Sequence, residues 1–187
     1  MVKKNSCVFI SGSGSNLKTL IINSRNYNFP INIKLIVSNK KNAPGLIFAK
    51  KYSIPFKIIN TNDSLYESKI LNEINKKKIS LICLAGYMKI LPKSFIQNFK
   101  GKIINIHPSL LPKYKGLNTH QRAIQNNEKF SGCTVHLVNS KLDSGKIILQ
   151  KKIKILKTDT SNKLAKRILK QEHILYPKAL KKVLTNL

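Results

Sequence analysis

The sequence predicts an α/β fold with an open, twisted, mostly parallel sheet, helices on both faces and a long helix at the C-terminus. Short apolar runs of the length of buried strands alternate along the chain with amphipathic segments of helical spacing. Glycine, proline and asparagine mark the junctions between them. Strand and helix alternation of this kind gives parallel strands joined by crossover helices, so we expect a Rossmann-like arrangement.

The chain has 187 residues, which is enough for one well-filled domain and short for two. We therefore expect a single domain over 1–187. Within it, the strand and helix units of about 1–100 are expected to bind phosphate, and about 101–187 to carry the catalytic residues. No repeat, linker or low-complexity segment interrupts this plan.

The first half of the chain is expected to alternate strictly between strands and helices. Apolar runs predict strands at 6–11 and 79–84, a strand whose end is at 35–40, and an edge strand at 54–59. Helical spacing predicts segments that begin at Asn16, at the Pro44-Gly45 pair, after Ser64 and at Pro92. The last three of these helices are expected to end near Tyr52, Lys78 and Phe99.

The second half begins with a buried strand at 103–107, which Pro108 ends. A connection rich in proline and glycine follows, and helical patterning resumes at 119–126. Alternating residues at 133–138 predict a strand that turns at 139–145 and pairs with a strand at 146–155. Residues 158–161 are expected to cap a helix over 162–184, which Pro177 is expected to kink or break.

A formal charge of +28 would suit a nucleic acid or an anionic membrane. However, the lysines are spread along the whole chain, arginine occurs at only three positions, and Lys, Asn and Ile are together what an AT-rich genome encodes. We therefore expect no specific nucleic acid and no membrane partner.

The three cysteines lack disulfide or zinc spacing and are expected in the core. With no signal peptide or long apolar run, we expect a cytoplasmic protein.

The segment from Gly12 to Asn16 joins the first strand to the first helix. Its glycines allow a tight loop, and the free N–H groups of the helix N-terminus form an anion site, although a plain turn remains the alternative. The third glycine of the dinucleotide fingerprint is Leu17 here, and no acidic residue ends the second strand. A phosphate monoester is therefore a better ligand than a nicotinamide or flavin dinucleotide.

The loop at 85–92, which follows the strand at 79–84, is unusually apolar. Exposed loops are normally polar. Tyr87, Met88, Ile90 and Leu91 therefore either pack under the sheet edge or line a cleft for a flat apolar ligand, and the residues alone leave both possibilities open.

Asn105 and His107 lie two positions apart at the end of a strand, so their side chains project to the same face. Such strand ends are where ligands bind in open α/β sheets. An amide donor and an imidazole suit a developing oxyanion, and Asp143 in a glycine-flanked turn is the natural carboxylate to contact His107 and raise its pKa. No nucleophile elbow and no metal-ligand spacing is present, which implies a nucleophile on the substrate and no metal.

The motif Asn105-Ile106-His107-Pro108-Ser109-Leu110-Leu111-Pro112, with Asp143 downstream, resembles the formyltransferase family that uses 10-formyltetrahydrofolate. The segments 10–17, 84–91 and 171–173 match the members of that family that formylate phosphoribosylglycinamide in purine synthesis. The likeness runs nearly from end to end, and its four separated motifs occur in the right order.

The resemblance implies direct formyl transfer from 10-formyltetrahydrofolate, as co-substrate, to the glycinamide amine, and it implies that about 101–187 is the catalytic and folate-binding part of the domain. Asn105 and His107 would stabilise the oxygen of the tetrahedral intermediate, and Asp143 would assist proton transfer through His107 and an ordered water. The phosphoribosylglycinamide would be held by Gly14, Ser15, Asn16 and Glu172. The folate would be held by Met88, Lys89, Ile90, Leu91, Asn105, Asn139, Ser140, Lys141, Leu142 and Asp143, which favours the cleft interpretation of the apolar loop.

Three departures from the family pattern are visible. The arginine that helps to bind the folate near Thr61–Tyr66 is missing, Lys115 and Asn118 stand where relatives often carry Pro and His, and the C-terminus is shorter than usual.

Two other enzymes, methionyl-tRNA formyltransferase and formyltetrahydrofolate hydrolase, share the strand-end motif and are the alternative functions. We expect no room in this chain for their additional domains. A monomer or weak homodimer is expected.

The other histidines are less informative. His136 lies in an alternating strand and is either a supporting residue of the site or a core histidine. His120 and His173 are expected on helix surfaces or at helix caps.

Overall fold

A computed structural model describes residues 2–185. Its strands are β1 (Lys4–Ile10), β2 (Ile31–Ser38), β3 (Phe56–Ile58), β4 (Leu81–Leu84), β5 (Lys102–His107), β6 (Phe130–Leu137) and β7 (Ile147–Lys154). Its helices are α1 (Ser15–Ser24), α2 (Leu46–Lys51), α3 (Tyr66–Lys76), α4 (Lys93–Asn98), α5 (Thr119–Gln125) and α6 (Ser161–Thr185). The strands follow the order β3-β2-β1-β4-β5-β6-β7 in a seven-stranded sheet, which confirms the predicted mostly parallel α/β class and places β3 at an edge.

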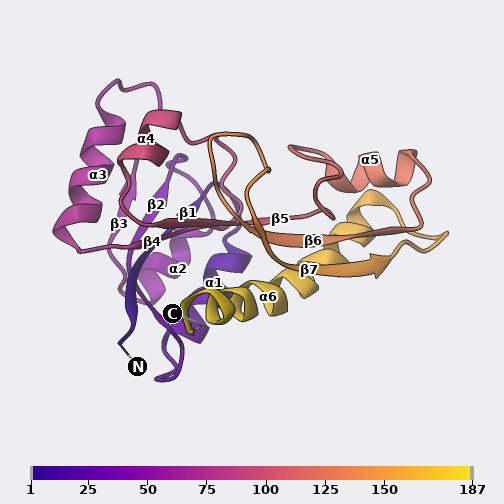
Figure 1. Ribbon diagram of the computed structural model, residues 1–187, viewed down its shortest axis with the longest axis horizontal. Helices are drawn as coiled ribbons and strands as arrows, with labels where there is room; N and C mark the ends of the chain where they lie inside the picture. The colour runs from indigo at the N-terminus through magenta and orange to yellow at the C-terminus, as the bar shows by residue number, and fades with distance from the viewer. Residues whose placement is uncertain (1, 186–187) are drawn as a thin grey trace. The chain divides into compact units, whose positions relative to one another are not determined.

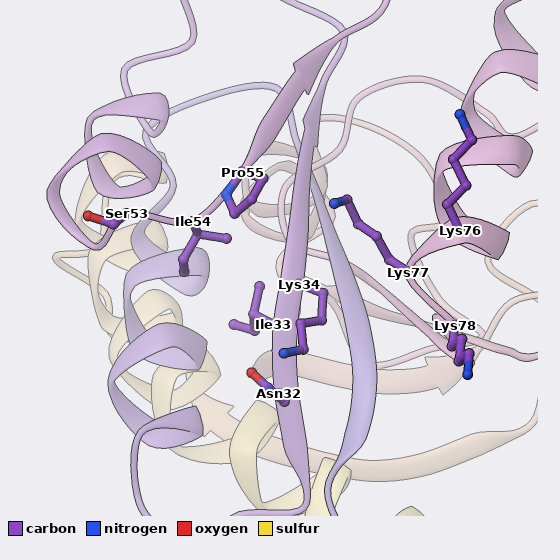
Figure 2. A pocket seen from close by; sticks show the side chains of 9 residues that line it. All are labelled: Asn32, Ile33, Lys34, Ser53, Ile54, Pro55, Lys76, Lys77 and Lys78. Carbon is purple, nitrogen blue, oxygen red and sulfur yellow. The ribbon is translucent and has the colours of Figure 1, made fainter.

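The chain divides into two compact units, one up to Ile104 and one from Asn105 onward. In the first unit, β1 pairs in parallel with β2 and with β4, and β2 pairs in parallel with β3. The last four residues of the central strand β1, at 7–10, are apolar and fully buried, as expected where both faces of a strand are covered. Helices α1 and α2 lie on one face of these strands and α3 on the other (Figures 1 and 2).

Beside the amino ends of β2 and β3 lies a hollow of about 470 Å³, lined by Asn32, Ile33, Lys34, Ser53, Ile54, Pro55, Lys76, Lys77 and Lys78 (Figure 2). Helices α2 and α3 both end here, each followed by a residue in the left-handed conformation, Ser53 or Lys78. The carbonyl ends of two helices attract cations, so the lysines complement the helix dipoles. The ammonium groups of Lys76 and Lys78 point in opposite directions and do not converge on a ligand (Figure 2).

In the second unit, β6 and β7 form an antiparallel pair, as the sequence predicts. Helix α6 packs along both strands, and α5 contacts α6 (Figure 1). The buried residues of α6 recur at helical spacing, from Leu164 and Ile168 to Leu175 and Ala179, so one apolar stripe faces the pair. This packing positions the turn between β6 and β7.

The expectation that Pro177 kinks or breaks the last helix is wrong in its stronger form, because α6 continues through Pro177 to Thr185. Proline in a helix interior costs about 3 kcal/mol through a lost hydrogen bond and a steric clash. Here the proline is buried, as are Leu175, Tyr176, Ala179 and Leu180 around it. Burial of this stripe outweighs the local penalty, since packing contributes more to a helix than propensity does.

Cys7, Cys83 and Cys133 are buried and free, which confirms their expected place in the core. Burial, and to a smaller extent Glu172, raise the pKa of the Cys133 thiol to about 12, whereas Lys151 lowers it slightly. Burial also raises the pKa of Cys7, so neither Cys7 nor Cys133 is a reactive thiolate at neutral pH. Over residues 2–185, no helix combines the length and the apolar character that a membrane span needs.

Candidate active site

Asn105 and His107 are in the last three residues of β5, in the unit that begins at Asn105. Extended backbone places both side chains on one face, and Pro108 follows at once and cannot continue the hydrogen-bonded ladder. His107 is 5% exposed, whereas Asn105 is half-buried. The strand end therefore presents an accessible amide next to a largely desolvated imidazole.

The contact predicted between Asp143 and His107 is present, with 3.3 Å between Asp143 Oδ2 and His107 Nδ1. Asp143 lies in the turn between β6 and β7 with φ 43°, in the left-handed region that aspartate tolerates better than most residues. The turn closes tightly at Gly145, where a Cβ would lie 1.7 Å from the Leu137 carbonyl oxygen. Only glycine fits there, and the fold-back it permits brings Asp143 to the strand end.

His136 on β6 is a supporting residue of the site. Its Nδ1 lies 2.7 Å from the Leu137 carbonyl oxygen, which can only accept, so Nδ1 carries a proton. In the neutral ring Nε2 is then an acceptor for the Asn105 amide, whose Nδ2 lies 3.3 Å away. The same Nδ2 also donates to Asp143 Oδ1 at 3.5 Å, so His136 and Asp143 together orient Asn105.

The connection between Pro108 and Thr119 encloses the other side of His107. His107 Nε2 lies 2.9 Å from the Tyr114 carbonyl oxygen and therefore donates to it. The backbone N–H of Gly116 donates to Asp143 Oδ2 at 2.9 Å, and Lys115 Nζ donates to Ser144 Oγ at 2.6 Å. The connection thus holds both members of the His107–Asp143 pair, through backbone groups that sequence patterning does not identify.

Burial lowers the pKa of His107, and the Tyr114 carbonyl and the Asp143 carboxylate only partly oppose this effect. Asp143 raises the His107 pKa, as expected, but the effect of burial is larger, so the net direction is downward. Burial also raises the pKa of Asp143, but contacts with His136, Gly116 N–H and His107 outweigh it and leave that pKa below its ordinary value. At neutral pH, the pair consists of a neutral imidazole and an ionised carboxylate.

In the first unit, the loop at Gly12–Asn16 leads into α1, as the sequence predicts, and Gly14 has φ 72°. A Cβ on Gly14 would lie 2.6 Å from the Cα of Gly45, so two glycine backbones are in direct contact. The backbone N–H of Gly45 also donates to the Gly12 carbonyl at 3.0 Å. Gly45, which the sequence suggests only as a helix start, therefore shapes the loop that exposes the α1 N-terminus.

Ser11 ties together the loops at the carboxyl ends of β1, β2 and β4. Its hydroxyl donates to Asn39 Oδ1 at 2.6 Å and accepts from the backbone N–H of Met88 at 2.8 Å.

The side chains of the apolar loop at 85–92 take two different positions. Tyr87 packs edge-on against Phe9 and Leu91 is buried, whereas Met88 and Ile90 are 59% and 71% exposed. Of the four residues expected to hold folate here, Leu91 thus turns its side chain into the core.

The other predicted binding residues take different positions. Asn139, Ser140, Lys141 and Leu142 are exposed in the turn that carries Asp143, and Leu142 is 48% exposed. Glu172 is buried on α6. The expectation that His120 and His173 are surface or capping residues is wrong, because each is half-buried with one ring nitrogen inaccessible and without a hydrogen-bond partner among residues 2–185.

A buried imidazole and carboxylate beside an oriented amide, at a strand end of an α/β sheet, define a site for acid–base chemistry on a substrate carbonyl. No cluster of three or more His, Cys, Asp or Glu residues that could hold a metal occurs in the described part of the chain.

The sequence profile of the family described as Formyl transferase matches residues 4–180. The chain therefore belongs to the formyl transferase family.

Individual relatives agree with this assignment. The phosphoribosylglycinamide formyltransferase of Haemophilus influenzae is 43% identical over 182 residues, which are 95% of this chain and 86% of that protein. The trifunctional purine biosynthetic protein adenosine-3 of Chironomus tentans is also 43% identical, over 97% of this chain. This chain spans only 14% of that longer relative.

Solved structures give the same result. The phosphoribosylglycinamide formyltransferase of Brucella melitensis superimposes with a TM-score of 0.91 at 43% identity, covering 97% of this chain and 95% of that one. The corresponding structure from Anaplasma phagocytophilum has a TM-score of 0.92 at 40% identity, over 98% of this chain and 88% of that one.

Proposed function

We propose that the protein transfers a formyl group from 10-formyltetrahydrofolate to the amine of 5'-phosphoribosylglycinamide, a step of purine biosynthesis. The observation that carries the proposal is the Asn105, His107 and Asp143 cluster, whose His107 and Asp143 atoms approach to 3.3 Å. The similarity to proteins named phosphoribosylglycinamide formyltransferase over nearly the whole chain supports the same reaction.

10-Formyltetrahydrofolate would supply the formyl carbon, and the substrate amine would be the nucleophile. The enzyme itself then needs no nucleophile, consistent with the burial of all three cysteines and with the raised pKa of Cys7 and Cys133. What it must supply is stabilisation of the negative oxygen that forms at the formyl carbon and removal of a proton from the amine.

Asn105 would donate to that oxygen. Its Nδ2 lies 3.3 Å from His136 Nε2 and 3.5 Å from Asp143 Oδ1, which are long distances for hydrogen bonds. Replacing one of these weak hydrogen bonds by a bond to an anionic oxygen would therefore be favourable. A donor of this kind contributes about 3 kcal/mol to the transition state.

The His107–Asp143 pair would accept the proton. Since His107 Nε2 donates to the Tyr114 carbonyl, the neutral ring directs the lone pair of Nδ1 at the Asp143 carboxylate. The Nδ1 lone pair and the ionised carboxylate repel each other. A proton bound between Nδ1 and Oδ2 would replace this repulsion by the attraction of an ion pair. An ordered water would carry the proton from the amine, and the resulting imidazolium would add positive charge next to the developing oxygen. The same proton would then pass to N10 as the bond between the formyl carbon and N10 breaks, so that tetrahydrofolate leaves and the amine nitrogen keeps the formyl group.

Substrate contacts are proposed from the same likeness. In the first unit, the N–H groups of Gly14, Ser15 and Asn16 at the start of α1 would bind the phosphate. The exposed side chains of Met88 and Ile90, beside Lys89 and the backbone of Leu91, would contact the flat folate ring. In the second unit, Glu172 would bind the ribose hydroxyls, and Asn139–Asp143 with Asn105 would contact folate. Within this unit, the exposed apolar side chain of Leu142 fits such a ligand.

The proposal includes small-molecule substrates and a cytoplasmic location, with no specific nucleic-acid partner and no resident metal, nicotinamide or flavin. The excess positive charge would then serve only to accelerate encounter with a phosphorylated, carboxylated pair of substrates.

The test is to mix the protein with 10-formyltetrahydrofolate and phosphoribosylglycinamide and to follow the folate absorbance. We expect turnover that requires the amine. Turnover without the amine would indicate a hydrolase instead, and formylation of methionyl-tRNA in preference to the glycinamide would indicate a tRNA enzyme.

A further inference from the structure

Tyr114 has an unusual backbone conformation for its position beside the catalytic histidine. Its φ is 55°, in the left-handed region, where a residue with a Cβ is strained. It is in this conformation that its carbonyl oxygen accepts from His107 Nε2 at 2.9 Å. Something must therefore hold Tyr114 in place, because strained residues persist only where their surroundings fix them.

The side chain of Tyr114 is held by three partners. Its hydroxyl donates to Glu128 Oε1 at 2.9 Å and accepts from Asn126 Nδ2 at 3.2 Å. The Arg122 guanidinium stacks over the ring at 5.2 Å from its centre and also donates to the Lys115 carbonyl at 2.7 Å. All three partners lie on α5 or just after it, so residues 122–128 hold the connection between Pro108 and Thr119 from one side.

Glu128 is the acidic partner of Tyr114. Besides Tyr114, it accepts from Lys113 Nζ at 2.7 Å, so one carboxylate oxygen binds two consecutive residues of the connection. Hydrogen bonds from Lys113 and then from Tyr114 lower the pKa of Glu128, so it is ionised at neutral pH. Lys113 is 64% exposed, and an exposed ion pair contributes little by itself. The bond that matters is the one to the tyrosine hydroxyl.

We propose that Glu128 is a positioning residue for His107. By accepting a hydrogen bond from the Tyr114 hydroxyl, it fixes the strained Tyr114 backbone. The Tyr114 carbonyl then holds the proton of His107 on Nε2, which leaves Nδ1 to face Asp143. The inference rests on the proposed function, since it assigns Glu128 a role in the proton acceptance by the His107–Asp143 pair. Glu128 itself touches neither the reacting groups nor His107.

The experiment combines kinetics with ¹⁵N NMR of the histidine rings, which reports the tautomer whether or not the protein is active. We expect Glu128→Ala and Tyr114→Phe each to lower kcat about tenfold with KM changed less than twofold, and the double variant to lose no more than either single one. In both variants the His107 ring should become a mixture of the two neutral tautomers. Glu128→Gln keeps an acceptor for the hydroxyl and should restore most of kcat.

Two controls separate positioning from general stability. Lys113→Met removes the ion pair but not the tyrosine bond and should change kcat less than twofold. Glu67→Gln alters another acidic residue that accepts from a hydroxyl, that of Ser94, and should change neither kcat nor the His107 spectrum. Thermal unfolding verifies that each variant is folded.

An unchanged His107 tautomer in both folded variants, Glu128→Ala and Tyr114→Phe, would overturn the inference. If wild-type protein shows no formyl transfer but the tautomer shifts in the variants as expected, the proposed function fails and the positioning of His107 by Glu128 stands. Loss of kcat in Lys113→Met equal to that in Glu128→Ala would contradict the assignment to the tyrosine bond.

Discussion

Asp143 Oδ2 lies 3.3 Å from His107 Nδ1, and both side chains are less than a tenth exposed. Burial of such a pair carries a desolvation cost, which the lowered His107 pKa reflects. The arrangement is consistent with a pair that shares one proton during a reaction and is neutral at the imidazole before it.

The first prediction concerns this pair. His107→Asn and Asp143→Asn should each lower kcat by about 100- to 1,000-fold, because either change removes the proton acceptor. Circular dichroism should be unchanged, since asparagine matches aspartate in size and is a smaller polar side chain than histidine, so neither change overpacks the site. A near wild-type rate in either folded variant would exclude that residue from the mechanism.

The second prediction concerns His136. His136→Asn places an amide N–H where the ring Nδ1 donates to the Leu137 carbonyl, but removes the Nε2 atom that faces Asn105. We expect kcat to fall about tenfold, because Asn105 loses one of the two groups that orient it, and KM to change little. The matched comparison is Asn105→Ala, which should cost about 3 kcal/mol of transition-state stabilisation. If His136→Asn retains full kcat, His136 is only a core histidine.

A third prediction tests the glycine loop. Gly14→Ala should destabilise the protein by about 2 kcal/mol and raise KM for the phosphorylated substrate, because φ is 72° and the new Cβ would meet Gly45 Cα at 2.6 Å. Gly12 is the control: nothing lies within 4 Å of a Cβ there, so Gly12→Ala should leave the melting temperature nearly unchanged. Equal effects of the two substitutions would refute the steric explanation.

The fourth prediction concerns pH. Burial lowers the pKa of His107, His120 and His173 below their ordinary value of 6.5. The unfolded chain therefore binds more protons than the folded one as the pH falls below about 6.5, and the free energy of unfolding decreases, by at most about 1.4 kcal/mol per pH unit for each histidine. Urea unfolding at several pH values between 7.5 and 5 measures the slope. His120→Gln should reduce that slope, and a flat profile would contradict the lowered pKa values.

The fold and the strand-end residues could be predicted from sequence because their signals are local. Apolar runs and glycine or proline junctions mark the elements, and Pro108 marks where β5 ends. The contact of Asp143 with His107 could also be predicted, since few acidic residues are available and one lies in a glycine-flanked turn.

What could not be predicted depends on contacts between distant segments. The orientation of Asn105 by His136, the donation from His107 to the Tyr114 carbonyl and the contact of Gly14 with Gly45 leave no periodic pattern in the sequence. The continuity of α6 through Pro177 follows from the burial of one helix face, which overrides the local preference of proline.

The most direct test of the central claim follows the formyl carbon itself. The protein is incubated with 10-formyltetrahydrofolate labelled with ¹³C at the formyl group and with phosphoribosylglycinamide, and the products are separated and analysed by mass spectrometry. We expect the label on the glycinamide nitrogen, at a rate reduced at least 100-fold in His107→Asn. Label recovered as free formate, or transfer at equal rates in both proteins, would contradict the account.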